Sequence, residues 1–344
     1  MCNIAGYVGT KQAAPILIEM MRKEEGYSGG YYTGIATIDE GKVYHAKISG
    51  DLKRLLDYTD AAHLKGTVGL LHSRSRSGGG DEWAQPYIGT GGHVAYIANG
   101  AAGLFATDER NIGQNNMARE LAAQGYHCRT RVNGAVGKYP QFDGTSVHSS
   151  DLCAQLMAKY IDDGIDASEA LDRAHIEMPS EKIGLAIYDA EPDCIIWSRV
   201  NYPMFVGFAD HGAYIATTPL AFPDDARDIV MADTNAGGRV YADRMTTNAY
   251  KNVNWDVAPI TAEVFEKAYD ACVQLLSEKL CGVGDLNGAV KPFLAEAFCK
   301  PIDALSYAVM AKLQKEGRLI TEVNRIPEAV NGVHATRFKM RLAQ

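Results

Sequence analysis

The chain opens with Met1-Cys2-Asn3-Ile4-Ala5-Gly6-Tyr7-Val8-Gly9, which places a cysteine directly before an apolar run with the character of a buried strand. Removal of Met1 would leave a thiol and a free α-amine on the same residue. Because an α-amine titrates at about pH 8 and a thiol at about 8.5, the amine of Cys2 could accept the proton of its own thiol. The stretch thus allows an N-terminal nucleophile, although position alone favours the simpler interpretation that Cys2 is a small residue left by initiator processing.

The order of the expected elements favours a layered fold of antiparallel sheets and helices over a doubly wound α/β fold. We expect the first helix to end at Gly26. Strands are expected at residues 3–8, 34–38, 42–46, 67–71, 94–97, 183–188, 194–199, 204–207 and 213–217. Helices are expected at residues 11–25, 117–124, 151–161 and 169–178.

The last quarter of the chain has a different pattern. Periodicity weakens over residues 224–254, and a strongly amphipathic helix starts near Ala262. We therefore predict two domains, residues 1–257 and 258–344. In the second, Gly282-Val283-Gly284 is expected to break the chain before helices at 292–298 and 303–315 and strands at 319–326 and 334–341. Two helices followed by a hairpin give a C-terminal α/β module with the outline of a winged helix.

Composition excludes several classes of protein. The chain has 344 residues, a net charge of −8 and 47% hydrophobic residues, which is typical of a globular protein with a real core. The seven cysteines are scattered, with no C-x-x-C or H-E-x-x-H motif, so no disulfide framework, metal site or cofactor is expected. Without an 18-residue apolar run or a secretory-type N-terminus, we expect a cytoplasmic protein that does not span a membrane.

The C-terminal module is basic within an acidic chain. Residues 291–344 hold nine Lys/Arg and five Asp/Glu, a net charge of +4, which leaves −12 for the remainder. A winged helix could bring such residues to DNA phosphates. The excess is modest, so we expect docking or homo-oligomerisation and disfavour nucleic-acid binding. The candidate phosphate contacts are Lys312, Lys315, Arg318, Arg337, Lys339 and Arg341.

Several separated segments of the first 245 residues or so resemble class II glutamine amidotransferases, which are N-terminal nucleophile (Ntn) hydrolases. The likeness is to the glutaminase domain of glucosamine-6-phosphate synthase, and order and spacing agree across the segments. The resemblance implies a four-layer αββα sandwich. The matching segments are the opening nine residues, Tyr27 to Ala36, Gly69 to Arg74, Val94 to Gly100 and Ile195 to Pro219.

Carried over residue by residue, the resemblance implies a thioester mechanism. Cys2 would attack the side-chain amide of glutamine, and water would then release glutamate. Asn99 and Gly100 would form the oxyanion hole. Arg74 would bind the substrate's α-carboxylate, and His72 would support the site from behind. The ammonia would pass to a separate synthase subunit, because no segment resembles a phosphosugar isomerase, an adenylating loop or a phosphoribosyl-pyrophosphate site.

One departure concerns the substrate's α-amine. The family's Asp-Thr-Glu, which supplies a carboxylate to that amine, aligns with Ser149-Ser150-Asp151 here, so Asp151 would have to substitute through a shift of register. Two alternatives therefore stay open. The chain could be a catalytically degenerate Ntn domain that acts as an amino-acid-sensing or DNA-binding regulator, or an Ntn amidohydrolase that acts on another amide.

Overall fold

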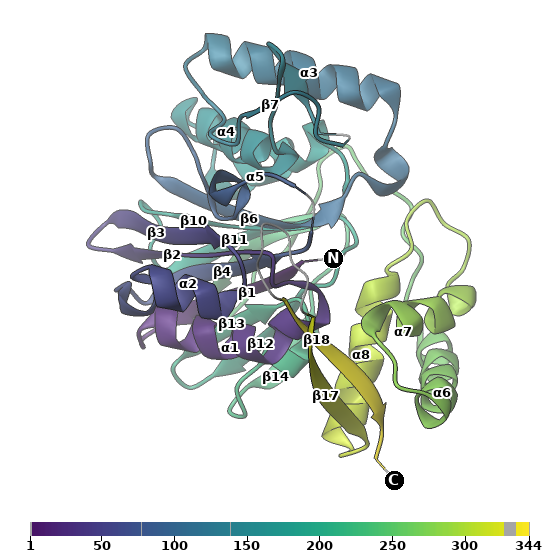
Figure 1. Ribbon diagram of the computed structural model, residues 1–344. Helices are drawn as coiled ribbons and strands as arrows, with labels where there is room; N and C mark the ends of the chain where they lie inside the picture. The colour runs from purple at the N-terminus through teal and green to yellow at the C-terminus, as the bar shows by residue number, and fades with distance from the viewer. Residues whose placement is uncertain (1, 77, 138, 327–334, 344) are drawn as a thin grey trace.

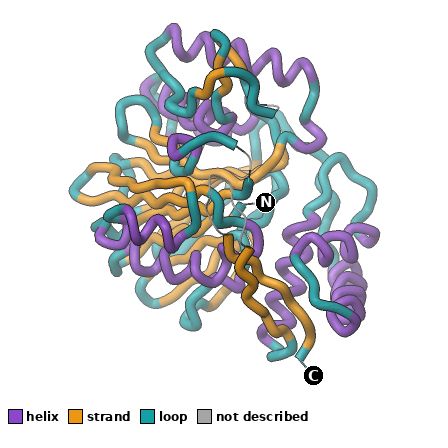
Figure 2. Tube along the Cα trace, in the orientation of Figure 1, coloured by secondary structure: helices purple, strands orange, loops and turns teal. Residues whose placement is uncertain are grey.

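Two antiparallel sheets pack face to face between layers of helices. The computed structural model describes residues 2–76, 78–137, 139–326 and 335–343. Helices α3, α4 and α5 cover one outer face, and α1 and α2 cover the other (Figure 1). Strands fill the middle of the molecule and helices its outside (Figure 2). This is the four-layer αββα sandwich that the sequence predicted.

The seven-stranded sheet has the order β14-β12-β13-β1-β4-β2-β3. Its central strand is the N-terminal one, which pairs with β13 on one side and with β4 on the other. The strands are β1 (Asn3–Gly9), β2 (Tyr32–Asp39), β3 (Lys42–Ser49), β4 (Val68–Arg74), β12 (Phe205–Ala209), β13 (Gly212–Ala216) and β14 (Arg227–Met231).

The six-stranded sheet has the order β16-β15-β11-β10-β6-β5. Its strands are β5 (Tyr87–Ile88), β6 (Val94–Ala101), β10 (Glu181–Tyr188), β11 (Cys194–Arg199), β15 (Ala236–Tyr241) and β16 (Asn248–Ala249). A small third sheet lies in the layer of α3, α4 and α5 (Figure 1). It contains β7 (Val132–Asn133), β8 (Gln141–Phe142) and β9 (Thr145–Ser146).

Alternating side chains in β1 hold the layers together. Ile4 and Val8 belong to the core between the two sheets, whereas Ala5 and Tyr7 belong to the core under α1. This division follows from the strand geometry, in which successive side chains point to opposite faces. The helices of the sandwich are α1 (Ala13–Ser28), α2 (Leu52–Tyr58), α3 (Asp108–Ala123), α4 (Ser149–Asp162) and α5 (Ala167–Glu177).

The sequence prediction was wrong at the end of the first helix. Gly26 lies inside α1, which continues to Ser28. A Cβ atom at Gly26 would lie 2.3 Å from the ring of Phe338. The glycine therefore serves close packing between α1 and the C-terminal hairpin, and it does not end the helix.

The C-terminal part packs against α1 and shares a hydrophobic core with it, including Met21, Leu305 and Met310. Figure 1 shows its hairpin lying beside α1. The prediction of a break at Gly282 to Gly284 was wrong, because α7 begins there, and only a single 3-10 turn falls within the expected helix at 292–298. The elements are α6 (Ala262–Glu278), α7 (Val283–Val290), α8 (Ile302–Lys315), β17 (Leu319–Ile326) and β18 (Ala335–Leu342).

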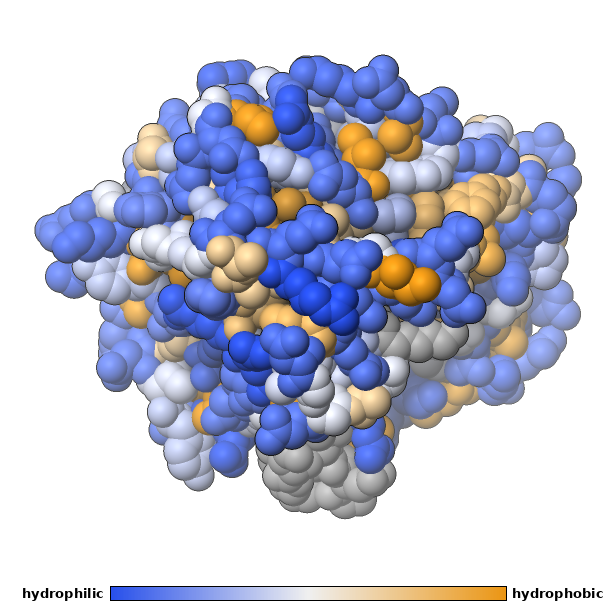
Figure 3. Space-filling view, turned by 90° about the horizontal axis from the view of Figure 1, so that it is seen from above, coloured by the Kyte–Doolittle hydropathy of each residue, from blue (hydrophilic) through white to orange (hydrophobic). Residues whose placement is uncertain are grey.

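Short 3-10 helices complete the described chain: η1 (Ala61–His63), η2 (Asp81–Trp83), η3 (Gly103–Phe105), η4 (Pro219–Ala221) and η5 (Lys291–Phe293). None of the helices in the described ranges has the length and apolar character needed to cross a bilayer. Seen from above, the molecule presents a mostly hydrophilic face with small separate hydrophobic patches (Figure 3). The division into two domains at 257/258 and the winged-helix comparison stay predictions.

Four of the six candidate phosphate contacts already have partners within the chain. Lys312 pairs with Glu266 at 3.3 Å, and Arg318 pairs with Glu316 at 3.6 Å. Arg341 pairs with Glu322 at 2.7 Å. Arg337 donates to the backbone oxygen of Gly29 at 2.7 Å. These contacts weaken the case for a DNA-binding surface.

Candidate active site

Cys2 lies at the start of β1, where the backbone is held by Asn99 from β6. The amide N–H of Cys2 donates to Asn99 Oδ1 at 2.9 Å, and Asn99 Nδ2 donates to the carbonyl of Cys2 at 2.8 Å. Because β1 and β6 belong to different sheets, this reciprocal pair joins the two sheets at Cys2. The Cys2 side chain is buried, with its Sγ 3.7 Å from Ser75 Oγ.

A cavity of about 360 Å³ opens at Cys2. It brings together four of the residues that the sequence singled out, namely Cys2, Arg74, Gly100 and Ser149. Asn99, His72 and Asp151 are not among the residues that line it. The lining is Cys2, Arg74, Ser75, Gln85, Ala98, Gly100, Ala101, Ala102, Arg110, Tyr139, His148, Ser149, Ser150, Ser180, Lys182 and Tyr202.

The surroundings of Cys2 favour its thiolate. Burial alone raises the pKa of the Cys2 thiol. A hydrogen bond from His72 and the positive charge of that residue outweigh the burial, so that the pKa falls from 9.0 to about 6. His72 Nε2 lies 3.0 Å from the carbonyl oxygen of Ala98. Since a carbonyl oxygen only accepts hydrogen bonds, Nε2 of His72 carries a proton and donates it. Nδ1 is the other ring nitrogen that can form a hydrogen bond. A thiolate is the nucleophilic form of cysteine.

Gly100 allows the two strands of this sheet to approach closely beside Cys2. Gly100 pairs with Lys182 of β10, and a Cβ atom at Gly100 would lie 2.4 Å from the carbonyl oxygen of Glu181. No larger residue fits without moving backbone. Both polar atoms of the Asn99 side chain form hydrogen bonds with the backbone of Cys2, so Asn99 holds Cys2 in place. Its role as an oxyanion donor stays a prediction.

Arg74, at the end of β4, is held over two aromatic rings. Its guanidinium carbon lies 4.7 Å from the ring centre of Tyr32 and 5.5 Å from that of Trp83. Arg74 also donates to the backbone oxygen of Trp83 at 3.0 Å and to the hydroxyl of Tyr139 at 3.3 Å. These contacts fix the guanidinium at the cavity wall without giving it a counterion.

Comparisons with known proteins agree with this arrangement. The chain is 25% identical over 275 residues to a glutamine–fructose-6-phosphate aminotransferase (isomerizing) of Leifsonia xyli, covering 79% of this chain and 40% of the relative. It is 22% identical over 333 residues to the enzyme of that name in Streptomyces coelicolor, covering 96% of this chain and 47% of the relative. The chain thus spans less than half the length of these relatives. No protein-family model matches the chain.

Solved structures give the same answer for the fold. A glutamine phosphoribosylpyrophosphate amidotransferase from B. subtilis, complexed with ADP and GMP, superposes with a TM-score of 0.58 at 14% identity, covering 93% of this chain and 66% of that chain. The chain has the class II glutamine amidotransferase fold. A second structure, described as the allosteric regulatory enzyme of purine biosynthesis, matches this class II fold with a TM-score of 0.58 at 15% identity and the same coverage.

The class II resemblance predicts a carboxylate at the cavity that would bind an α-amine. The structure does not place Asp151 there. Ser149 lines the cavity at the N-terminus of α4, whereas Asp151 is buried away from it. One oxygen of Asp151 accepts from the backbone N–H groups of Arg129 and Thr130 at 2.8 and 2.9 Å. The other accepts from Gln155 Nε2 at 2.9 Å. Asp151 anchors a loop to α4, and the structure does not bring it to the cavity.

Two cations of the cavity were missed from the sequence. Lys182 is the second residue of β10, and the sequence pattern had placed the start of that strand at Ile183. Arg110 lies in the first turn of α3, which begins nine residues earlier than the expected 117. Neither residue lies in a recognisable motif, so no signal in the sequence pointed to it.

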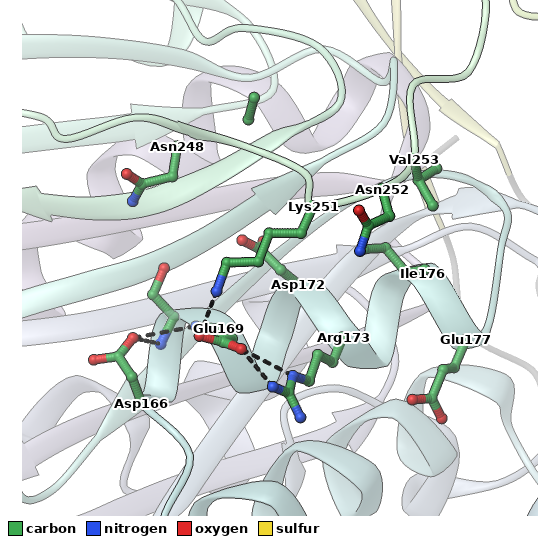
Figure 4. Close-up of a pocket in the computed structure, with 12 residues that line it drawn as sticks. Asp166, Glu169, Asp172, Arg173, Ile176, Glu177, Asn248, Lys251, Asn252 and Val253 are labelled. Carbon is green, nitrogen blue, oxygen red and sulfur yellow. Dashed lines mark hydrogen bonds and ion pairs between the residues drawn. The ribbon is translucent and has the colours of Figure 1, made fainter.

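A second hollow, of about 790 Å³, lies between α5 and residues 248–253 (Figure 4). Both basic residues of its lining pair with the same acidic residue, Glu169. Glu169 pairs with Arg173 at 2.5 Å and with Lys251 at 2.9 Å. In the described ranges, no group of three or more His, Cys, Asp or Glu side chains is arranged to hold a metal ion. The cavity at Cys2 therefore remains the candidate active site of this class II fold.

Proposed function

We propose that the chain hydrolyses the terminal carboxamide of glutamine or a close analogue through a thioester on Cys2. One observation carries the proposal: a cysteine thiol with a pKa of about 6 opens on a cavity beside Gly100, with its backbone held by Asn99. The sequence similarity to glutamine–fructose-6-phosphate aminotransferases supports an amide as the substrate.

The reaction has two steps. The Cys2 thiolate attacks the amide carbon, a C–S bond forms, and the C–N bond breaks as the nitrogen takes a proton and leaves as ammonia. Water then attacks the thioester carbon, the C–S bond breaks, the carboxylate product forms and the Cys2 thiolate is regenerated, while the two protons of the water replace those that the leaving nitrogen has taken up as ammonium. After removal of Met1, the α-amine of Cys2 would carry the proton between thiol and leaving group, because its pKa lies near neutral pH.

The remaining residues would stabilise and orient the substrate. The backbone N–H of Gly100 and, after a small rotation, the amide of Asn99 would donate to the tetrahedral oxyanion. Arg74 would bind a carboxylate of the substrate through its planar guanidinium. The ammonia would pass to an acceptor on a partner synthase, since the chain spans less than half of relatives whose name joins glutamine to fructose 6-phosphate. In this proposal, residues 258–344 dock that partner.

The test is ammonia release from glutamine and related amides by the purified chain, with Cys2→Ala as the control and the N-terminal residue identified by intact mass. We expect turnover by protein that starts at Cys2 and none by Cys2→Ala. Turnover that survives Cys2→Ala would overturn the proposal. Binding without turnover in the wild type would instead favour a catalytically degenerate regulator.

A further inference from the structure

Among the described residues, the cavity at Cys2 is lined by three cations and by no carboxylate. The cations are Arg74, Arg110 and Lys182, and the acidic group that accompanies them is the Cys2 thiol. Resting on the proposed function, we propose that its substrate is a carboxylic acid amide without an ammonium group, with a 2-oxo or second anionic group in the place of the amine of glutamine. The monoamide of a 2-oxodicarboxylic acid represents this class.

The three cations have no carboxylate partner among the described residues, and one thiolate at Cys2 cannot balance three positive charges. None of them forms an ion pair with a residue in the described ranges, and their contacts are with neutral groups. Arg74 and Lys182 are also nearly fully buried, with 1% and 5% of their surface exposed. A buried charge without a partner costs several kcal/mol, so two such cations in one cavity indicate that an anionic ligand completes the site.

Lys182 has a donor left for a ligand. Its Nζ donates to the carbonyl oxygen of Met178 at 2.6 Å and lies 3.7 Å from Cys153 Sγ. An ammonium has three N–H donors, so one remains for the cavity. Because Lys182 pairs with Gly100 across β10 and β6, this donor originates next to the proposed oxyanion site.

The three cations come from both large sheets and from the helical layer that contains α3. Arg74 ends β4 of the seven-stranded sheet, and Lys182 lies on β10 of the six-stranded sheet. Arg110 lies on α3, where its Nε donates to the carbonyl oxygen of Pro179 at 2.7 Å. A ligand that fills the cavity would thus meet positive charge from three separate elements, which suits a molecule with two acidic or carbonyl oxygen groups.

Among the described residues that line the cavity, no carboxylate is present to pair with an ammonium group. The residues beside the class II position of the carboxylate are the hydroxyls of Ser149 and Ser150 and the ring of His148. Both carboxylate oxygens of Asp151 already accept hydrogen bonds elsewhere. Glu181, next to Lys182 in the chain, points to the other face of the strand, where it accepts from Asn201 Nδ2 at 3.0 Å. Glutamine would place its ammonium among cations and neutral groups.

The test compares amides that differ only at this position. Ammonia release would be measured for glutamine, for glutaramate, which lacks the amine, and for 2-oxoglutaramate. We expect kcat/KM for 2-oxoglutaramate to exceed that for glutamine by roughly tenfold or more, because only glutamine places an ammonium group beside the three cations. If glutamine is hydrolysed at least as well, this inference is wrong while the proposed function stands. If no amide is hydrolysed, the proposed function itself fails.

Variants connect the preference to the cations. Lys182→Met should raise KM for 2-oxoglutaramate roughly tenfold and so reduce its advantage in kcat/KM over glutamine. Lys182→Glu should move the preference toward glutamine, because it supplies the missing carboxylate. Lys267→Met, an exposed control on α6, should behave as wild type. If the Lys182 variants do not fold, Arg110→Met decides, since it should raise the same KM, and an unchanged preference would overturn the inference.

Discussion

At the scale of single residues, His72 links the fold to the chemistry of Cys2. The sequence suggested a supporting histidine, and the structure gives it a physical task. Burial alone would keep the Cys2 thiol protonated at neutral pH, whereas the hydrogen bond and charge of His72 bring its pKa to about 6. A thiol with this pKa is mostly thiolate at pH 7 and becomes protonated as the pH falls through 6.

We predict that His72→Gln raises the pKa of Cys2, because burial then acts without the opposing imidazole. The measurement is the rate of iodoacetamide labelling of Cys2 as a function of pH, which should have its midpoint near 6 in the wild type and above 8 in the variant. His93→Gln, at an exposed histidine paired with Asp189, is the control and should keep the wild-type midpoint. A midpoint that does not move in His72→Gln would contradict this role.

Whether a site residue could be predicted from the sequence depends on whether it lies in a recognisable motif. Cys2, Arg74 and Gly100 lie in segments whose residue types and spacing carry a recognisable chemistry, so they could be placed together before the structure was known. Lys182 and Arg110 lie in no such segment. Their proximity to Cys2 depends on the pairing of β10 with β6 and on the path of α3, which are long-range features. The catalytic and binding roles of all five residues stay predictions.

At the scale of elements, α1 and β18 meet so closely that only a glycine fits between them. Gly26 lies under the ring of Phe338, which joins a helix of the sandwich to the C-terminal hairpin. From the sequence, glycine near the end of an amphipathic run indicates a helix terminus, because glycine is a poor helix former. Tertiary packing overrides that preference here.

We predict that Gly26→Ala lowers the free energy of unfolding by about 1–3 kcal/mol, because the new methyl group overlaps the Phe338 ring. The measurement is chemical denaturation followed by circular dichroism. Gly288→Ala is the matched control, since Gly288 is exposed in α7 with no atom near its added Cβ. The control should be stabilised by up to about 1 kcal/mol through helix propensity alone. Equal effects at the two sites would refute the close packing.

Apolar runs in the sequence predicted some elements of the fold and missed others. Strand β11 was expected with the bounds that the structure has, because all of its residues are buried and apolar runs mark it. Strand β14 was missed because it is a short edge strand within residues 224–254, where the periodicity of the sequence is weak. Helix α7 was missed because two glycines hide the buried Leu286 and Val290.

At the scale of the whole molecule, buried carboxyl groups couple stability to pH. Glu25 of α1 is buried, and its Oε1 accepts from Ser73 Oγ at 2.7 Å and from the backbone N–H of Leu52 at 2.8 Å. Burial raises the pKa of Glu25 from 4.5 to about 7, against the lowering effect of the Ser73 hydrogen bond. Between the unfolded pKa of 4.5 and the folded pKa of about 7, Glu25 stays protonated in the folded chain and ionises in the unfolded chain. The free energy of unfolding therefore falls as the pH rises through this range.

We predict that Glu25→Gln removes part of this pH dependence. The amide keeps an acceptor for Ser73 and Leu52 but cannot ionise. Relative to wild type, the variant should therefore be more stable at pH 8 than at pH 5, by at most about 3 kcal/mol. Denaturation curves at the two pH values measure the difference. Glu19→Gln, at an exposed position of the same helix, is the control. Parallel stability curves for wild type and Glu25→Gln would show that Glu25 does not titrate as described.

The arrangement of the layers could be predicted from the sequence because short strands and helices alternate in a recognisable order and the motifs resemble a known family. The packing of the C-terminal part could not. Its helices and hairpin contribute to the same core as α1, through contacts such as Phe338 over Gly26 that join residues more than 300 positions apart. Local patterns contain no information about such contacts.

The central claim, that Cys2 is the nucleophile of an amide hydrolase, is tested most directly by acid-quenched intact-mass spectrometry during turnover. The purified chain is mixed with 2-oxoglutaramate or glutamine, quenched in acid within a turnover, and mapped by peptide mass. We predict a chain that begins at Cys2 and carries one acyl group on its N-terminal peptide, with no adduct in Cys2→Ala. Ammonia release by a chain that retains Met1, or an acyl group on any other residue, would contradict the account.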